Sequence, residues 1–379
     1  MSLGIQTDTK TNELLALADQ VGKRMAETGE EHDRDESFVS DGFQTLKEAG
    51  FFKALVPVEL GGGGASYREM CEAIRRLGTY CGSTALAFSM HCHLIAVPVW
   101  RREHEKAPVD GLLKRVAGEG LILISSGGSD WLNSSGSATR VDGGFRINGR
   151  KVFASGCPMG DLLMTSAVYA DPDNGATVLH FGVPFKAEGV TLLDTWHVMG
   201  MRGTGSQDVQ LSDVFVPDAA IAGRRPQGKW HPLFHAVSMI ALPMVYAAYL
   251  GVAESARAKA IAAARKKAEG GQLATLVGRL ENAFAQAEMA HERMVAVAET
   301  SKPSPETTGR ALIARTLTGR AAIETVERAM EVVGGASFYR ALGLERAFRD
   351  VQGARFHPLQ ELPQLEFSGR LALGMDIDG

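Results

Sequence analysis

The sequence predicts an α+β protein with an N-terminal α-helical domain, a middle antiparallel β-barrel or sandwich, and a C-terminal four-helix bundle. Three changes of pattern along the chain support this order. Apolar residues lie three and four positions apart as far as about Gly118, alternate with polar residues between Leu121 and Pro217, and return to helical spacing after Ala222. The domains expected from these changes are residues 1–118, 119–219 and 220–379.

The composition is that of an ordinary globular protein. With 379 residues, of which 45% are hydrophobic and 22% charged, the chain is long enough for two or three domains. A net charge of -4 and the lack of a clustered basic face argue against nucleic acid as a partner. Four cysteines without a CxxC pair indicate reduced thiols, so a cytoplasmic protein is expected.

Neither a membrane segment nor a metal site is expected. The longest apolar run, Met239 to Ala253, is interrupted by Pro243 and is too short to cross a bilayer. His91 and His93 are two positions apart in a helical pattern, so their side chains point to different faces. We expect both to be packing residues, one of which could border a substrate cavity.

The middle part of the sequence has the regularly spaced turn residues that are typical of a compact β domain. Between Leu121 and Pro217, short β-rich runs are separated by Asp-Gly, Asn-Gly and Asp-Pro-Asp-Asn-Gly turn signals. No crossover helices interrupt the runs and no complete GxGxxG occurs, which excludes a Rossmann unit. Any dinucleotide bound here must be held by hydroxyls, backbone amides and a neighbouring helical domain.

Four helical segments with short connections follow and predict an antiparallel bundle. The first runs from about Leu233 to Lys267, and the second carries its leucines on one side. The third begins with Ser304 as its N-cap and stops at Gly334 and Gly335. The fourth is broken by two prolines before it resumes.

Three stretches of sequence carry the chemistry: the polar run Ser125 to Asp130, the strand Arg146 to Gly156, and the segment Trp196 to Pro217. The Asn148-Gly149 pair alone is explained by an ordinary hairpin turn. In this order, however, the stretches resemble the middle domain of the acyl-CoA dehydrogenase superfamily. There a Gly-Ser-Asp run, a Lys-x-(Trp/Phe)-x-(Thr/Ser) strand and a Gly-Met-Arg-x-Thr-x-Ser segment follow one another. The resemblance extends over nearly the whole chain.

This resemblance implies a flavin site on the middle domain. By position in the family's strand, Phe153 covers the flavin ring and the Ser155 hydroxyl contacts N5, where protonation changes on reduction. The residues placed at the pyrimidine side and the phosphates are Ser125 or Ser126, Gly128 and Ser129. The implied cofactor is FAD, or FMN or reduced flavin if the protein is a monooxygenase.

The bundle contributes a second flavin-related segment. Ala329 to Phe338 resembles a Gln-x-x-Gly-Gly-x-Gly segment that, in the family, reaches the adenine half of FAD across a subunit interface. Glu331 occupies the glutamine position, and Gly334 and Gly335 allow close backbone approach. The resemblance therefore implies a homotetramer. KKAEGG at 266–271 replaces the family's Arg-x-x-Phe-Gly, and a helix C-cap is the alternative explanation of the two glycines.

The family's catalytic glutamate is missing. Counting on from LERAFRD at 344–350, that glutamate falls at Pro358, and the alternative glutamate of some members falls near Ala241. Dehydrogenation of an acyl thioester needs a base that removes the α-proton while hydride leaves to the flavin. The candidates are His357, with a reference pKa of about 6.5, and Glu361. A His357 that merely caps a loop is the alternative.

Three functions are compatible with these residues. The first, favoured by whole-chain similarity, is an FAD-dependent oxidoreductase that dehydrogenates a small molecule such as an acyl-CoA and passes electrons to a partner. The second is a flavin-dependent monooxygenase supplied by a flavin reductase; family branches of that kind carry Phe-x-Ser-Gly on the N5 strand and a late histidine, as Phe153, Ser155 and His357 do here. The third is a non-catalytic flavoprotein scaffold.

Overall fold

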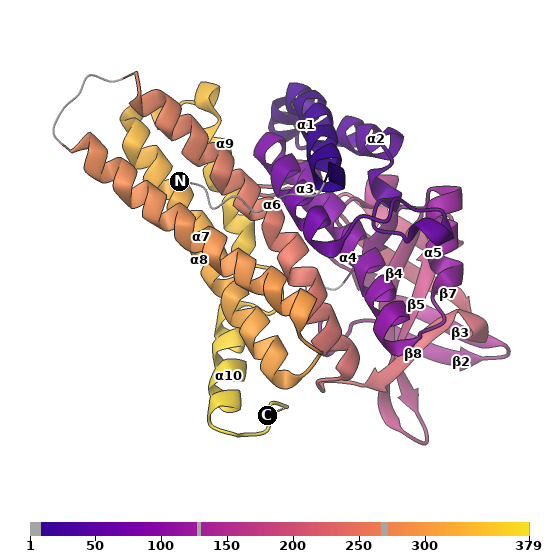
Figure 1. The fold of residues 1–379 in the computed structure, drawn as a ribbon. Helices are drawn as coiled ribbons and strands as arrows, with labels where there is room; N and C mark the ends of the chain where they lie inside the picture. Colours follow the sequence, from indigo (N-terminus) through magenta and orange to yellow (C-terminus); the bar gives the residue numbers. More distant parts are fainter. Residues whose placement is uncertain (1–8, 127–129, 267–271, 379) are drawn as a thin grey trace.

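The computed structural model describes residues 9–126, 130–266 and 272–378 (Figure 1). A helical N-terminal part, a β-sheet and a helical C-terminal part follow one another along the chain, as the sequence predicts. In Figure 1 the sheet lies beside the N-terminal helices, and the long C-terminal helices form the opposite side of the molecule.

Five α-helices make up the N-terminal part as far as it is described. They are α1 (Thr9–Asp35), α2 (Ser40–Glu48), α3 (Tyr67–Tyr80), α4 (Gly82–Glu105) and α5 (Asp110–Glu119). The start of α3 is fixed by a capping box in which Ser66 and Glu69 satisfy each other's backbone N–H groups. Helix α4 is apolar around most of its circumference, and its residues up to Cys92 are all buried.

The described strands form one eight-stranded sheet. They are β1 (Leu123–Ser125), β2 (Ser137–Val141), β3 (Gly144–Lys151), β4 (Leu162–Asp171), β5 (Gly175–Pro184), β6 (Val190–Leu193), β7 (Asp208–Pro217) and β8 (Ile221–Pro226). Their order is β6-β7-β3-β2-β4-β5-β8, with β1 beside β4. The pairings are antiparallel except those of β4 with β1 and with β2.

The prediction of a turn at Asn148-Gly149 is wrong. Both residues lie inside β3, where the pairing with β7 is irregular between Ile147 and Gly149. The Asn148 side chain accepts a hydrogen bond from the backbone N–H of Asp213 at 2.8 Å. A Cβ on Gly149 would lie 2.6 Å from the Cα of Gly136, so glycine is needed there for close strand approach rather than for a turn.

The described residues of the C-terminal part form three long α-helices and two short ones. They are α6 (Pro232–Ala264), α7 (Leu273–Thr300), α8 (Pro305–Val333), α9 (Leu344–Val351) and α10 (Glu361–Ala372). The predicted proline break falls between α9 and α10. Pro363 is accommodated in the first turn of α10, where its missing N–H costs no helical hydrogen bond.

Helices α4 and α6 are long and apolar enough to span a membrane by length and composition alone. The most apolar windows of the two are 78% and 94% buried within the protein, which is typical of core helices. Helix α6 packs on α3 at a pair of glycines, since a Cβ on Gly78 would lie 2.7 Å from the carbonyl oxygen of Ala248 and one on Gly251 2.2 Å from that of Arg75. Helix α6 therefore packs the bundle closely against the N-terminal helices.

Candidate active site

The end of β3 displays an aromatic ring on a strained backbone. Phe153 has φ = 57°, a left-handed conformation that is rare for a bulky residue, and its side chain is 49% exposed. Its ring meets the ring of Trp196 edge to face, with 5.9 Å between centroids. The chain thus holds a large apolar surface in the open next to Ser155, as a site for a planar ring requires.

Ser155 begins a row of three hydroxyls. Its Oγ lies 2.8 Å from the Oγ of Ser206, which lies 2.7 Å from the Oγ1 of Thr204. Thr204 in turn donates to the carbonyl oxygen of Met201 at 2.9 Å. All three hydroxyl residues are buried. The row joins the predicted N5 contact to the loop between β6 and β7, and sequence reasoning did not identify Ser206 or Thr204 individually as site residues.

The polar run before the strand is only partly described. Ser125 ends β1, and the Ser126 hydroxyl lies 2.7 Å from that of Thr165 on β4. The predicted residues Gly128 and Ser129 lie outside the described residues. Beyond them, Asp130 forms a buried ion pair with Lys151 at 2.8 Å.

That ion pair fixes the polar run to the end of β3. The Lys151 ammonium also donates to the carbonyl oxygen of Ser135 at 2.6 Å. Burial lowers the pKa of Lys151, and the adjacent Asp130 carboxylate opposes this effect. The ion pair joins the two predicted cofactor segments, because Asp130 ends the polar run and Lys151 belongs to the KVFASG motif. The lysine of that motif, two positions before Phe153, could have indicated the pair from sequence.

His357 lies at the centre of a second polar cluster, in the loop between α9 and α10. Its Nε2 is 2.6 Å from the hydroxyl of Tyr249 on α6. Arg315 on α8, whose side chain is only 2% exposed, donates from Nη2 to the carbonyl oxygens of His357 at 2.6 Å and Ala354 at 3.3 Å. The Tyr246 hydroxyl donates to the Ala354 carbonyl oxygen at 2.6 Å. Two helices therefore hold the loop that carries the imidazole.

The imidazole of His357 is neutral at neutral pH. Burial, the Arg315 guanidinium and the nearby His93 lower its pKa to about 3. The reference pKa assumed from sequence therefore does not apply, and His357 is a weaker base than expected. Burial raises the pKa of Tyr249 well above its usual range, so its hydroxyl stays protonated.

The two histidines of α4 differ in role. His91 is a packing residue as expected, because its Nδ1 accepts from the backbone N–H of Leu123 at 3.0 Å and its Nε2 then donates to the carbonyl oxygen of Phe52 at 2.7 Å. His93 is half-buried, and burial together with His91 lowers its pKa to about 4. Since His93 also acts on the pKa of His357, α4 contributes to the His357 cluster.

The other predicted base lies in a different environment. Glu361 begins α10, and its carboxylate forms an ion pair with the partly exposed Arg320 of α8. Within the described residues, no hydrogen bond joins Glu361 to His357, and none joins His357 to Ser155. The two clusters are connected instead through α4, which carries His93 and packs against the Arg202–Thr204 turn.

The predicted adenine-binding residues lie at the end of α8. Glu331 pairs with Arg328 at 2.8 Å. Gly334 caps the helix with φ = 76°, which accounts for a glycine there. Both Gly334 and Gly335 are exposed, and a Cβ on either would meet nothing within 4 Å among the described residues. The segment is thus open to approach from outside this chain.

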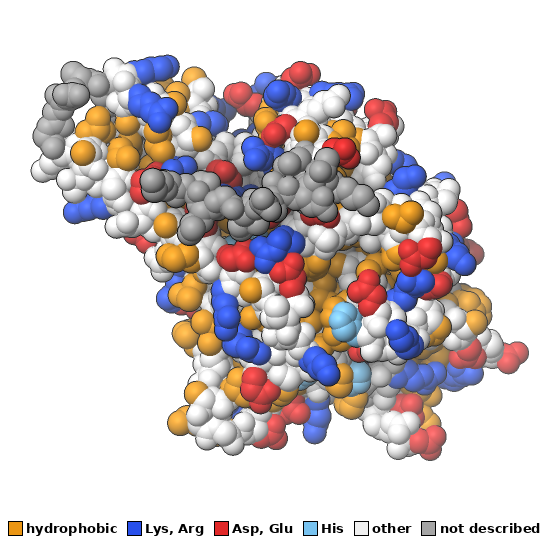
Figure 2. Space-filling model, viewed as in Figure 1, with side chains coloured by type: hydrophobic (Ala, Val, Ile, Leu, Met, Phe, Trp, Pro, Cys, Tyr) orange, Lys and Arg blue, Asp and Glu red, His pale blue; other side chains and the backbone are white. Residues whose placement is uncertain are grey.

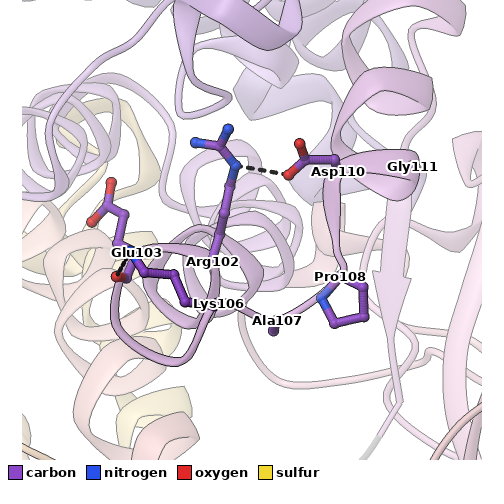
Figure 3. Close-up of a pocket in the computed structure, with 7 residues that line it drawn as sticks. All are labelled: Arg102, Glu103, Lys106, Ala107, Pro108, Asp110 and Gly111. Atoms are coloured by element: carbon purple, nitrogen blue, oxygen red, sulfur yellow. Dashed lines mark hydrogen bonds and ion pairs between the residues drawn. The ribbon is translucent and has the colours of Figure 1, made fainter.

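A cavity of the described residues lies elsewhere. It has a volume of about 800 Å³ and opens at the turn between α4 and α5 (Figure 3). Arg102 lines it but is already paired with Asp110 at 2.7 Å and Glu59 at 2.8 Å. None of the predicted site residues borders it. On the face drawn in Figure 2, hydrophobic and histidine side chains instead gather where the bundle meets the rest of the protein.

Comparison with known proteins identifies the fold family. The N-terminal, middle and C-terminal domain models of acyl-CoA dehydrogenases match residues 11–107, 125–214 and 242–357. A putative acyl-CoA dehydrogenase, YdbM of Bacillus subtilis, is 26% identical over 94% of this chain and 96% of its own length. The amino sugar nitrososynthase RubN8 of Streptomyces rubradiris is 27% identical over 97% of this chain and 90% of its own.

A solved structure extends this comparison. KijD3 in complex with FMN and dTDP-3-amino-2,3,6-trideoxy-4-keto-3-methyl-D-glucose superimposes with a TM-score of 0.88 at 27% identity, covering 100% of this chain and 97% of that protein. The matches to all three domain models, in the expected order, agree with the described fold. The chain belongs to the acyl-CoA dehydrogenase superfamily of flavin-dependent oxidoreductases.

Proposed function

We propose that this protein is a flavin-dependent monooxygenase that uses reduced flavin and O₂ to oxidise a small molecule. The observation that carries the proposal is His357, held by Tyr249 and Arg315 beside Pro358, where acyl-CoA dehydrogenases have their catalytic carboxylate. The similarity to a nitrososynthase and to an FMN-bound protein with an amino sugar nucleotide supports it further. Dehydrogenation, the function favoured from sequence, is less well supported.

The reason is the strength of the available bases. Removing the α-proton of an acyl thioester requires a base whose pKa is near the working pH. A pKa of about 3 makes His357 a poor match, and Glu361 is tied to Arg320. A hydrogen-bond donor in a buried site, by contrast, is useful to an oxygenase, because it can stabilise charge that develops on oxygen.

We place the proposed flavin against the end of β3 on the β domain. We propose that Phe153 covers the ring, that Ser155 faces N5, and that Ser125, Ser126, Gly128 and Ser129 hold the pyrimidine and phosphate side. When bound in its reduced form, the flavin supplies the electrons that activate O₂. FMN is favoured over FAD because Glu331 is engaged by Arg328 and the Arg-x-x-Phe-Gly segment is replaced.

His357 then acts as a fixed hydrogen-bond donor. Tyr249 stays protonated, and its hydroxyl has no other hydrogen-bond acceptor among the described residues, so it donates to Nε2. The ring proton of the neutral imidazole is therefore on Nδ1. Arg315 holds the loop at two carbonyls and fixes the direction in which this donor points. A non-catalytic scaffold would not need hydrogen bonds to both the imidazole and the backbone carbonyl of one histidine.

We also propose a cytoplasmic homotetramer that receives its reduced flavin from a separate reductase. Self-association is supported by large apolar side chains exposed on the C-terminal part of the chain, namely Phe338, Tyr339, Leu362, Leu365 and Leu373. The exposed Gly334 and Gly335 lie in the same part of the chain. Phe338 and Tyr339 follow Gly334 and Gly335 directly, so a second subunit that covers these two rings would also approach the end of α8.

The test compares the two chemistries on the same preparation. Protein loaded with oxidised FMN or FAD is mixed anaerobically with acyl-CoA thioesters, and the flavin absorbance is followed. We expect no bleaching. Protein loaded with reduced FMN is then mixed with O₂ and amine, sulfide or phenol substrates, and an oxygenated product is expected by mass spectrometry with an ¹⁸O₂ label. Bleaching by a thioester would overturn the proposal in favour of dehydrogenation.

A further inference from the structure

The hydrogen bonds in the row of hydroxyls that begins at Ser155 have a preferred donor-to-acceptor order. Each serine or threonine hydroxyl can donate one hydrogen bond and accept up to two. At the inner end, the partner of Thr204 is the carbonyl oxygen of Met201, which can only accept. Thr204 therefore donates its proton to Met201 and must accept from Ser206.

This assignment propagates outward to Ser155. Ser206 uses its proton on Thr204 at 2.7 Å, so it can only accept from Ser155, whose Oγ is 2.8 Å away. The Ser155 proton is thereby committed to the interior. What Ser155 offers to the open side is a pair of lone pairs, so it is an acceptor there and not a donor.

The donors and acceptors of the row can also be reversed, so that Ser155 donates outward, but one hydrogen bond is then lost. If Ser155 donated outward, Ser206 would donate to Ser155 and Thr204 to Ser206, and the Thr204 hydroxyl bond to Met201 would be lost. The Met201 carbonyl would still be satisfied by the indole N–H of Trp196 at 3.2 Å and by the backbone N–H of Thr204 at 3.0 Å. Because only one hydrogen bond separates the two directions, the inward one is preferred but not locked.

The N5 atom of a flavin changes its hydrogen-bonding role with oxidation state. In oxidised flavin N5 is an acceptor, and in two-electron-reduced flavin it carries a hydrogen and donates. We propose that the row Ser155–Ser206–Thr204 makes this site select reduced flavin, because its inward direction presents an acceptor to N5. This rests on the proposed function, in which Ser155 faces N5. A protein that takes reduced flavin from a reductase would gain from such a preference, since oxidised flavin would compete less for the site.

The experiment measures the ratio of two dissociation constants, that of oxidised FMN over that of reduced FMN, without turnover. Oxidised FMN is titrated by fluorescence quenching and reduced FMN anaerobically. For the parent the ratio should exceed one. Ser206→Ala frees the Ser155 hydroxyl to rotate and should lower the ratio about three- to tenfold, the effect of one hydrogen bond. A tenfold change corresponds to a bound-flavin potential lower by about 30 mV for a two-electron couple.

Thr204→Val should lower the ratio further than Ser206→Ala. Without an acceptor at Thr204, Ser206 donates to Ser155 and the row reverses, so that Ser155 becomes a donor suited to oxidised flavin. Thr204→Ser keeps the row and should keep the parent ratio. Thr325→Val controls for loss of a buried threonine hydroxyl, because Thr325 is fully buried on α8 and donates only to the carbonyl oxygen of Ala321.

The outcomes separate this inference from the proposed function. Flavin binding with an equal ratio in the parent, Ser206→Ala and Thr204→Val would overturn the hydroxyl row as the selector and leave the monooxygenase proposal standing. A parent ratio of one or less would overturn it even if both variants failed to fold. Failure of the parent to bind either form of flavin would instead remove the proposed function on which the inference rests.

Discussion

The two clusters of the candidate site, one around Ser155 and one around His357, contain different kinds of hydrogen-bonding groups. The Ser155 cluster on the β domain consists of neutral hydroxyls that can exchange donor and acceptor roles by rotation at the loss of one hydrogen bond. The His357 cluster in the bundle contains a buried guanidinium, Arg315, that can only donate and that binds two backbone carbonyls. The hydroxyls of the Ser155 cluster can change their donor and acceptor roles when the ligand changes, whereas Arg315 holds the His357 loop in one orientation.

This difference indicates a division of roles. A cofactor that changes its hydrogen-bonding pattern is best met by groups that can adapt at little energetic cost. A group that must stabilise developing charge works best when it is oriented in advance. The hydroxyls of Ser155 and Ser206 fit the first description, and the imidazole held by Tyr249 and Arg315 fits the second.

The largest expected effect comes from removing the fixed donor. His357→Ala should lower the yield of oxygenated product by roughly a hundredfold, as general acid and base groups do. Oxygen consumption by the reduced flavin should continue and should appear as peroxide, since the Ser155 side is untouched. Product and peroxide are measured together in single-turnover reactions. Unchanged product yield would show that the bundle side does not take part in oxygenation.

A smaller effect should follow from releasing the ring rather than deleting it. Tyr249→Phe removes the partner of Nε2 and leaves the imidazole free to change tautomer, so product yield should fall by about tenfold, the worth of one hydrogen bond. The His357 tautomer is read by ¹⁵N NMR. Tyr246→Phe is the matched control, because the Tyr246 hydroxyl bonds the Ala354 carbonyl and not the ring. Equal losses in both variants would indicate loop packing rather than ring orientation.

The same environment predicts a pH dependence of stability. Burial and Arg315 lower the pKa of His357 to about 3 in the folded protein, while in the unfolded chain it is about 6.5. Between these values the unfolded state binds more protons, so this contribution to stability is lost as the pH falls below about 6.5.

His357→Gln should therefore lose less stability than the parent on going from pH 7 to pH 5, by about 2 kcal/mol. The free energies of unfolding come from urea titrations at the two pH values. His91, His180 and His291 also have lowered pKa values, but they are present in both proteins and cancel in the difference. Parallel losses would mean that His357 is not held neutral.

Sequence predicted the two clusters unequally, and the reason is the distance between partners along the chain. Phe153 and Ser155 lie within one short motif, so a local pattern was enough to single them out as candidates, and the order of the three domains followed from changes in periodicity. His357 was found as a neighbour of the missing glutamate, but its partners Tyr249 and Arg315 are 108 and 42 positions away. No local pattern connects a tyrosine in an apolar helix to a loop that far along the chain.

Burial was the second quantity that sequence could not supply. The reference pKa of His357 suggested a base for neutral pH, whereas burial, Arg315 and His93 lower its pKa to about 3 and make it a much weaker base. The Asn148-Gly149 pair failed for a similar reason. Its turn propensity was overruled by pairing with β7 and by the close approach of Gly136.

The smallest expected effect concerns Glu361, the other base proposed from sequence. Its carboxylate is paired with Arg320 at the start of α10, and both side chains are more than a third exposed. Glu361→Gln removes the charge and keeps the shape. Because exposed ion pairs contribute at most about 1 kcal/mol, we expect a small loss of stability and little change in product yield. Both are measured beside His357→Ala in the same assays. A Glu361→Gln protein that binds reduced FMN normally but forms no product, together with an active His357→Ala protein, would place the reactive group one helical turn beyond the His357 cluster and would reverse the comparison between the adaptable and the rigid side of the site.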